Sequence, residues 1–144
     1  MINPLIEVWD SPFGSPPFDR IKISHYKQAV RRSIRKAITE IKNIAGNPEP
    51  PDFRNTIEAI EKAGADLGRV TPVLFNLNSA ETSKQLQETT QVVSPLLTKF
   101  SNDITLNRKL FKRIKEVYEK RESSFLDAEQ RMLTEKNKVL IGII

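Results

Sequence analysis

The side chains of this sequence that could carry out chemistry are few and poorly spaced. The chain has one histidine, His25, and no cysteine. A zinc site needs three or four ligands, usually His or Cys with a carboxylate, and a Ser-His-acid triad needs a histidine held by an acid. At the start of a predicted helix, a residue such as His25 is more often a surface residue than a base. The sequence therefore predicts no catalytic, cofactor-binding or metal-binding residue in this chain.

Four acidic residues form the other candidate cluster: Asp52, Glu58, Glu61 and Asp66. Paired carboxylates can act as a general acid and base. On the exposed side of a helix, however, they more often face solvent or interact with the helix dipole. The glycine-containing segments "GADLG" and "GNP" lack the spacing of a phosphate-binding loop and the strand that precedes one. No active site follows from these residues.

Positive charge is concentrated in two stretches. Residues 20–42 contain eight Lys and Arg against one Glu, and residues 105–122 contain seven against three, within a chain of formal net charge +5. Two basic helices could bind phosphate or nucleic acid, but such charges are more often the solvated faces of amphipathic helices. The aromatic residues that bind single strands by stacking are not interleaved with these charges, so we rank nucleic acid last among the partners.

The elements that must position these residues are helices preceded by an arm. Residues 1–22 are rich in proline and predict an extended arm packed on the domain, pinned by Trp9, Phe13 and Phe18. Ser24 is the expected N-cap of a helix that ends at Ala45 before Gly46. Its apolar residues are spaced three or four apart and form one stripe: Ile23, Tyr26, Val30, Ile34, Ala37, Ile41 and Ile44.

The second helical segment begins in "PPDFRNTIEAIEKAG", residues 50–64. Asn55 is the expected cap, with Glu58 in the capping-box position. Because the ring of Pro72 clashes with the carbonyl of Gly68, the sequence predicts a kink, or two helices meeting, near residues 68–72. Gly64, Gly68 and Pro72 share one face, which suggests the close approach of a neighbouring helix.

Three further helices are expected. One starts near Glu81 and is interrupted by Pro95, one is capped by Asn107, and one is capped by Asp127 with Gln130 as its capping-box partner. Ser123 and Ser124 mark the break before the last of them. No segment alternates over the length of a strand. The predicted fold is therefore all-α, a bundle of four to five antiparallel helices, two of them kinked or broken at proline, in a lobe spanning residues 23–144.

The two ends of the chain give further expectations. The N-terminus lacks the pattern of a secretory signal, and no apolar run approaches the roughly 20 residues that span a bilayer; we expect a cytoplasmic protein that does not bind membranes. After Leu133 the apolar stripe should return near Lys136 and Asn137, where polar residues stand, and "VLIGII" then ends the chain. An apolar terminus predicts a missing continuation or a covering partner.

A series of short motifs resembles a known family. The series comprises "NPL", "PPFDRIKISHYKQA", "NPEPPDFRNTIEAIEKAGADLGRV", "VLFNLNSAET" and "SPLLTKFSNDITLNRKLFKRIKEVYEKR". It resembles the N-terminal region of the thimet-oligopeptidase-like zinc metallopeptidases, and most closely the dipeptidyl carboxypeptidase (peptidyl-dipeptidase) branch. Phe53–Ile57 is similar to that family's aromatic-x-Asn-Thr segment. The resemblance covers about residues 3–135 and fails afterwards, as a shifted reading frame or a chosen end of the chain would explain.

The resemblance implies the N-terminal helical lobe of a longer enzyme that releases C-terminal dipeptides from peptides. Such enzymes hold zinc in a His-Glu-x-x-His helix far downstream, so no zinc ligand or catalytic residue transfers to this chain, which would be inactive alone. The expected partner is a downstream catalytic region, or a second copy through the apolar C-terminus, with peptides bound only in the full-length context. The alternative is a free-standing helical protein-interaction module.

Overall fold

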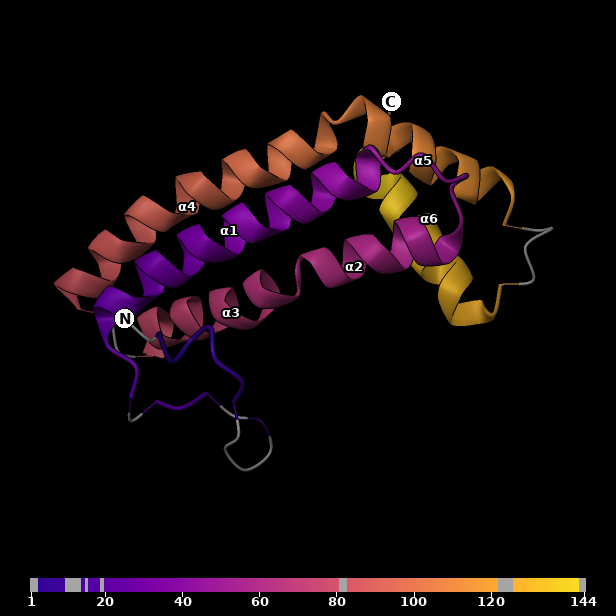
Figure 1. Cartoon of the computed structure of the whole chain (residues 1–144). Coiled ribbons are helices and arrows are strands. Elements are labelled where there is room, and N and C mark those ends of the chain that lie inside the picture. Colours follow the sequence, from indigo (N-terminus) through magenta and orange to yellow (C-terminus); the bar gives the residue numbers. More distant parts are fainter. Residues whose placement is uncertain are drawn as a thin grey trace. The chain divides into compact units, whose positions relative to one another are not determined.

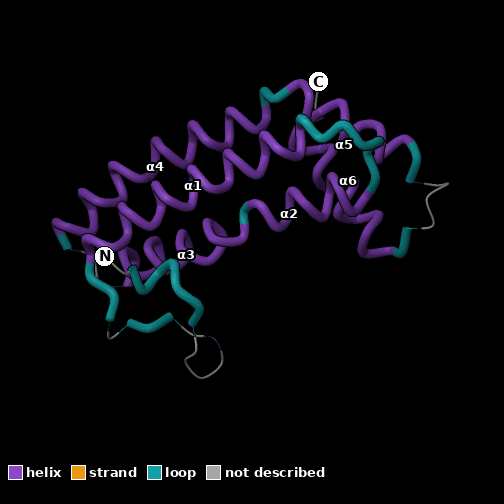
Figure 2. Tube along the Cα trace, viewed as in Figure 1, coloured by secondary structure: helices purple, strands orange, loops and turns teal. Residues whose placement is uncertain are grey.

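The structure is a computed structural model that describes residues 3–9, 14, 16–18, 20–80, 83–121 and 126–142, with side chains as far as residue 138. The described residues form helices and loops and no strand (Figure 2). The predicted all-α class, a helical bundle, is confirmed. Its elements are α1 (Ile23–Ala45), the π-helical segment η2 (Phe53–Glu58), α2 (Ala59–Ala63), α3 (Ala65–Ala80), α4 (Lys84–Thr105), α5 (Arg108–Glu119) and α6 (Ala128–Gly142). The α-helices are labelled in Figure 1.

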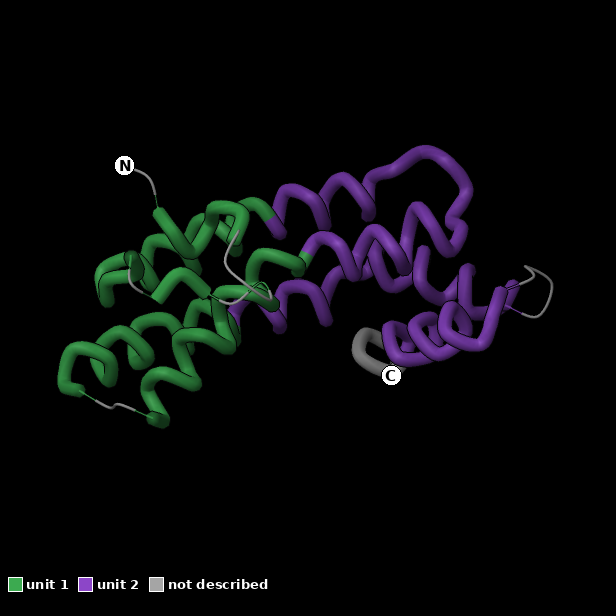
Figure 3. The backbone as a smooth tube through the Cα atoms, turned by 90° about the horizontal axis from the view of Figure 1, so that it is seen from below, with its two compact units in different colours: residues 1–36, 64–98 green, residues 37–63, 99–144 purple. Residues whose placement is uncertain are grey.

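The chain divides into two compact units (Figure 3). Unit 1 comprises Met1–Lys36 and Gly64–Thr98, and unit 2 comprises Ala37–Ala63 and Lys99–Ile144. The helices α1 and α4 each contribute residues to both units. The predicted division into an arm (1–22) and a lobe (23–144) stays a prediction.

Unit 1 buries apolar side chains from three helices, in the pattern expected of amphipathic helices. Tyr26 and Val30 of the predicted stripe on α1 are buried together with other residues of α1, α3 and α4: Ala29, Leu67, Val70, Leu74, Leu86 and Val93. Both α3 and α4 contain a proline, Pro72 and Pro95, and each continues beyond it.

The arm is held by specific contacts. Asn3 and Leu5 are buried, and the side-chain amide of Asn3 donates to the carbonyl of His25 over 2.9 Å. The guanidinium of Arg69 lies over the ring of Trp9, 4.9 Å from its centre. The expectation that Phe18 also pins the arm is wrong, because its side chain is exposed; Phe13 lies outside the described residues.

The start of α1 differs from the prediction that Ser24 is the N-cap. The helix begins at Ile23, so Ser24 already lies within its first turn. The backbone N–H of Lys22 donates to Nδ1 of His25 over 2.8 Å. A side chain three residues into the helix thereby satisfies a donor that the helix itself cannot.

The second helical segment also begins earlier than predicted. The N-cap is Asp52, not Asn55, and Asn55 is its capping-box partner. The interruption predicted near residues 68–72 lies instead at Gly64, between α2 and α3. The expected close approach at the glycines is wrong, since a Cβ atom at Gly64 or Gly68 would meet nothing within 4 Å.

Unit 2 has one hydrophobic core, formed by α2, α5 and the ends of α1 and η2: Ile41, Ile44, Ile57, Ala63, Leu110, Ile114 and Val117. Two caps predicted from the sequence are confirmed. The Asn107 side chain accepts from the N–H of Leu110 over 3.0 Å, and Asp127 and Gln130 form a reciprocal pair at 2.8 and 3.1 Å. Ser123 and Ser124 lie outside the described residues.

The buried stripe of α6 does not stop after Leu133. Thr134 and Asn137 are both buried, and their polar groups are paired. The hydroxyl of Thr134 donates to the carbonyl of Gln130 over 2.8 Å, and the amide of Asn137 donates to Glu61 over 3.0 Å and to the carbonyl of Leu133 over 2.8 Å. Polar residues therefore take the positions where the sequence pattern called for apolar ones.

Candidate functional site

The best-connected polar cluster of the described chain is centred on Arg113 in unit 2. This residue lies on the apolar face of α5, between Leu110 and Ile114, and is only 7% exposed. Its Nη1 donates to the carbonyls of Asn47 and Glu49 over 2.9 and 3.0 Å, and Nη2 donates to Oδ1 of Asn55 over 3.1 Å. The guanidinium therefore ties the loop after α1 and the start of η2 to α5.

Asn55 is the second member of this cluster and uses both ends of its amide. Oδ1 accepts from the N–H of Asp52 and the hydroxyl of Thr56, both over 2.8 Å, in addition to Arg113. Nδ2 donates to the carbonyl of Pro50 over 2.9 Å. Only an amide side chain combines an acceptor oxygen with two donors, which explains why this position needs asparagine. We call Arg113, Asn55 and their partners the Arg113 clamp.

The Arg113 clamp holds the fold together and offers no reactive group. Arginine stays protonated in proteins, and the oxygen atom of Asn55 is already occupied by three donors. The cluster contains no nucleophile with an adjacent base, which acyl transfer would require. The chemistry available here is hydrogen bonding between segments of the chain.

The four carboxylates considered from the sequence have separate partners. Asp52 caps η2, Glu58 pairs with Lys62 at 3.1 Å, and Glu61 accepts from Asn137. In unit 1, Asp66 pairs with Lys36 at 3.0 Å. No group of three or more His, Cys, Asp or Glu residues among the described residues could hold a metal ion. The His and carboxylate donors of these described residues therefore do not fit a zinc site.

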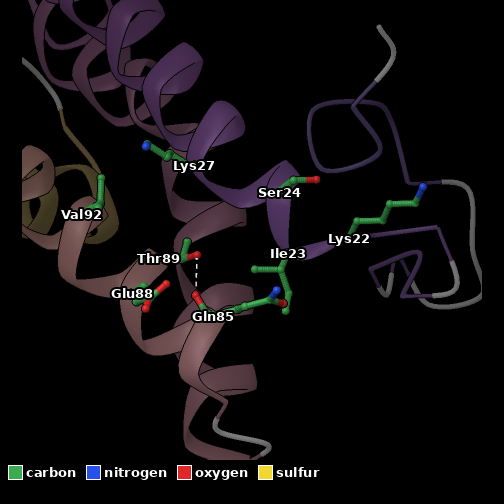
Figure 4. Close-up of a pocket in the computed structure, with 8 residues that line it drawn as sticks. All are labelled: Lys22, Ile23, Ser24, Lys27, Gln85, Glu88, Thr89 and Val92. Carbon is green, nitrogen blue, oxygen red and sulfur yellow. Dashed lines mark hydrogen bonds between the residues drawn. The ribbon is translucent and has the colours of Figure 1, made fainter.

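A pocket in unit 1 of about 580 Å³ lies where α1 begins and α4 passes (Figure 4). Its lining mixes two lysines, one glutamate and small polar and aliphatic side chains: Lys22, Ile23, Ser24, Lys27, Gln85, Glu88, Thr89 and Val92. The hydroxyl of Thr89 donates to the carbonyl of Gln85 over 2.8 Å, and His25 is absent from the lining. The lining offers no nucleophile with an adjacent base, so it supports a surface groove rather than a catalytic centre.

Tyr26 on α1 is a buried titratable residue. Burial raises the pKa of the Tyr26 hydroxyl above its ordinary value of 10.0, because desolvation disfavours the phenolate. The hydroxyl is buried and has no hydrogen-bond partner among the described residues. A tyrosine that keeps its proton in a closed environment is a core residue here.

Sequence reasoning overlooked Arg113, although a signal was present. Arg113 stands three residues after Leu110 and four before Val117, so a basic residue lies within the apolar stripe of α5. It also placed the cap at Asn55, whereas the spacing from Asp52 to Asn55 is itself that of a capping box.

None of the helices, within the residues described, is long and apolar enough to cross a membrane. No family model matches the chain. The chain is 41% identical over 133 residues to the dipeptidyl carboxypeptidase of Salmonella typhimurium and 40% identical over 134 residues to that of Escherichia coli; these spans cover 92% and 93% of this chain. Oligopeptidase A of Escherichia coli is 26% identical over 117 residues, or 81% of this chain.

The chain spans about a fifth of the length of these relatives, since the matched regions cover 20% of each dipeptidyl carboxypeptidase and 17% of the oligopeptidase. The resemblance predicted from the sequence is confirmed: this chain resembles the N-terminal region of dipeptidyl carboxypeptidases. The Arg113 clamp, with residues 47–55, lies inside the matched region that defines this resemblance.

Proposed function

We propose that this chain is the N-terminal helical lobe of a peptidyl-dipeptidase-like zinc metallopeptidase and that it is not catalytic by itself. The observation that carries the proposal is the 41% identity to a dipeptidyl carboxypeptidase across 92% of the chain. By the family resemblance, the complete enzyme releases dipeptides from the C-termini of peptides. A cytoplasmic location is part of the same proposal.

The residue types of this chain support the proposed lack of activity. The sequence holds one histidine and no cysteine, whereas a zinc site with an activated water needs three protein ligands. His25 is engaged at the start of α1, and the four candidate carboxylates are dispersed. The zinc and the catalytic glutamate of the family would therefore come from a different region.

The partner in this proposal is a downstream catalytic region. The chain would supply helices to one lobe of the assembled enzyme and contribute no group to the reaction. A peptide would reach this lobe only in that assembly.

The test has two steps. The purified chain is first assayed for bound zinc and for the release of a dipeptide from a blocked tripeptide; we expect neither. It is then mixed with an Escherichia coli dipeptidyl carboxypeptidase that lacks the region matched by this chain, and we expect zinc-dependent activity to be restored. Release of dipeptide by the chain alone would contradict the first part of the proposal.

The free-standing interaction module makes a different prediction. In that case the chain does not complement the truncated enzyme, and it forms a stable dimer that depends on its apolar C-terminus. Sedimentation of the chain with and without residues 139–144 measures this. A monomer in both forms, together with complementation, favours the peptidase lobe.

A further inference from the structure

A second cavity in unit 1 has a lining very different from that of the pocket in Figure 4. Its volume is about 500 Å³, and it is bounded by α1, α3 and the arm. The arm contributes Ile6 and Val8, and the helices contribute three basic side chains, one carboxylate and one hydroxyl: Arg32, Lys36, Arg69, Asp66 and Ser33. We call it the basic cavity.

The charges of the basic cavity do not balance. Asp66 is its one carboxylate, and it is shared between Lys36 at 3.0 Å and Arg69 at 3.8 Å. Arg32 makes no ion pair with another side chain in the described part of the chain. The lining thus carries three positive charges against one negative charge. An anion entering the cavity would offset this excess.

Two hydrogen-bond donors of the lining are buried and have no acceptor among the described residues: the hydroxyl of Ser33 and Nε of Arg69. Ser33 is only 3% exposed. A buried polar group without a partner costs about 1–3 kcal/mol, and native structures contain few of them. The hydroxyl of Ser33 and the charge excess are independent observations, and both call for an acceptor that carries negative charge.

From this arrangement we infer that the basic cavity binds a phosphoryl group. A phosphate presents several acceptor oxygens on one centre and pairs strongly with guanidinium groups. The volume lies within the range of small-molecule sites, roughly 300–1,000 Å³, so the cavity has room for a phosphorylated small molecule. Arg32 and Ser33 would bind the phosphoryl oxygens, and Lys36 and Arg69 would supply the surrounding positive field.

Arg69 connects such a ligand to the arm. Its Nη2 donates to the carbonyls of Leu5 and Ile6 over 3.5 and 3.1 Å, and its guanidinium lies over Trp9. A phosphoryl group beside Arg69 would therefore bind at the place where the arm meets α1 and α3. This inference does not depend on the proposed peptidase function.

The test is a calorimetric titration of the full chain with inorganic phosphate and with phenyl phosphate, at constant ionic strength maintained with sodium chloride. We expect saturable binding of both, with phosphate competing against phenyl phosphate. Tighter binding of phenyl phosphate identifies a phosphorylated organic molecule as the ligand, and equal binding identifies free phosphate. Absence of saturable binding by either probe would overturn the proposal.

Three substitutions on α1 make the test specific. Arg32→Gln and Ser33→Ala should each weaken binding about tenfold, which is the factor that corresponds to one lost hydrogen bond to a charged group. Arg31→Gln is the matched control, because Arg31 is exposed on the same helix and does not line the cavity. Equal weakening by Arg31→Gln and Arg32→Gln would show only general attraction to a basic helix and would refute the site. Circular dichroism of each variant checks that α1 remains folded.

Discussion

Replacing Arg113 with methionine should destabilise the protein far more than the same change at the adjacent residue. The substitution removes three hydrogen bonds of 2.9–3.1 Å from a side chain that is 7% exposed. Methionine keeps an unbranched side chain that can fill the space on the apolar face of α5. The measured loss then reports mainly on the Arg113 clamp rather than on a cavity.

The magnitude follows from the three acceptors. A hydrogen bond to a charged group contributes about 1.5–3 kcal/mol, so a simple sum would be roughly 5–9 kcal/mol. The true loss is smaller for two reasons. Glu49 and Asn47 are accessible to solvent, so water can replace part of the lost hydrogen bonding. Removing the guanidinium also removes the free-energy cost of burying its charge. We expect a decrease of about 2–4 kcal/mol in the free energy of unfolding.

The assay is urea unfolding followed by circular dichroism, with Lys112→Met as the matched control. Lys112 is the preceding residue of α5 and is exposed, so its replacement removes the same charge and should change stability by less than about 0.5 kcal/mol. A thermal scan should show the same order, with Arg113→Met lowering the melting temperature by roughly 5–15 °C.

Two results would refute this reasoning. Equal stability of Arg113→Met and Lys112→Met would mean that the clamp contributes nothing net. Full rescue by Arg113→Lys would mean that charge suffices, whereas the clamp needs a planar group that reaches two carbonyls and an amide at once. A double-mutant cycle with Asn55→Ala should give a coupling energy of about 0.5–3 kcal/mol, because the two side chains share a hydrogen bond.

Three further predictions concern single positions. Below pH 10, Tyr26→Phe should leave the free energy of unfolding unchanged or raise it, because the lost hydroxyl has no hydrogen-bond partner among the described residues. The folded state holds the Tyr26 proton to a higher pH than the unfolded state, so the free energy of unfolding of the parent should fall above about pH 10. Urea titrations at several pH values should show that this fall is smaller in the variant. Gly68→Ala should stabilise the protein by about 0.5–1 kcal/mol in thermal scans, because the added methyl group has no atom within 4 Å and the unfolded chain loses conformational freedom. Gly46→Ala should give no such gain, because its methyl group would lie 3.2 Å from the carbonyl oxygen of Lys42. Asn107→Ala should destabilise by about 1 kcal/mol in urea unfolding, since it removes the cap of α5, and no change would mean that water caps the helix equally well.

The sequence predicted the helices well because their buried stripes are regular. The apolar spacing on α1 and α5 marks residues that are buried in the structure, such as Val30 and Leu110. The caps at Asn107 and Asp127 were also predictable, because Asn and Asp are preferred N-cap residues and each directly precedes a helical segment. The spacing of apolar residues and the hydrogen bonds of helix caps both depend on residues close together in the sequence.

What could not be predicted depends on contacts between distant residues. Asn137 is buried against Glu61, 76 residues away, and nothing beside Asn137 in the sequence indicates that partner. The sequence predicts the break near residues 68–72 rather than at Gly64 because Pro72, as a helix breaker, outweighs a glycine when the sequence is considered alone. In the structure α3 runs through Pro72, and tertiary packing overrides the local preference.

In the candidate sites, too, features that depend on residue type were predictable, and features that depend on contacts between distant residues were not. The absence of a catalytic set could be argued directly from residue types, since one histidine and no cysteine leave little choice. The basic cavity could not be found in this way, because Ser33 and Arg69 lie 36 residues apart and meet only through the packing of α3 against α1 and the arm.

The segment Phe53–Ile57 stabilises the fold through the hydrogen bonds of Asn55. Phe53–Ile57 contains the asparagine whose single oxygen receives the backbone of Asp52, the hydroxyl of Thr56 and the guanidinium of Arg113. Aspartate would keep the acceptor but could not donate to Pro50, and alanine would lose all four bonds. Asn55→Asp should thus retain part of the stability that Asn55→Ala loses, with a residual deficit that reflects the missing donor and the repulsion between two neighbouring carboxylates. If both variants unfold at the same urea concentration, the acceptor oxygen of Asn55 contributes nothing net to stability.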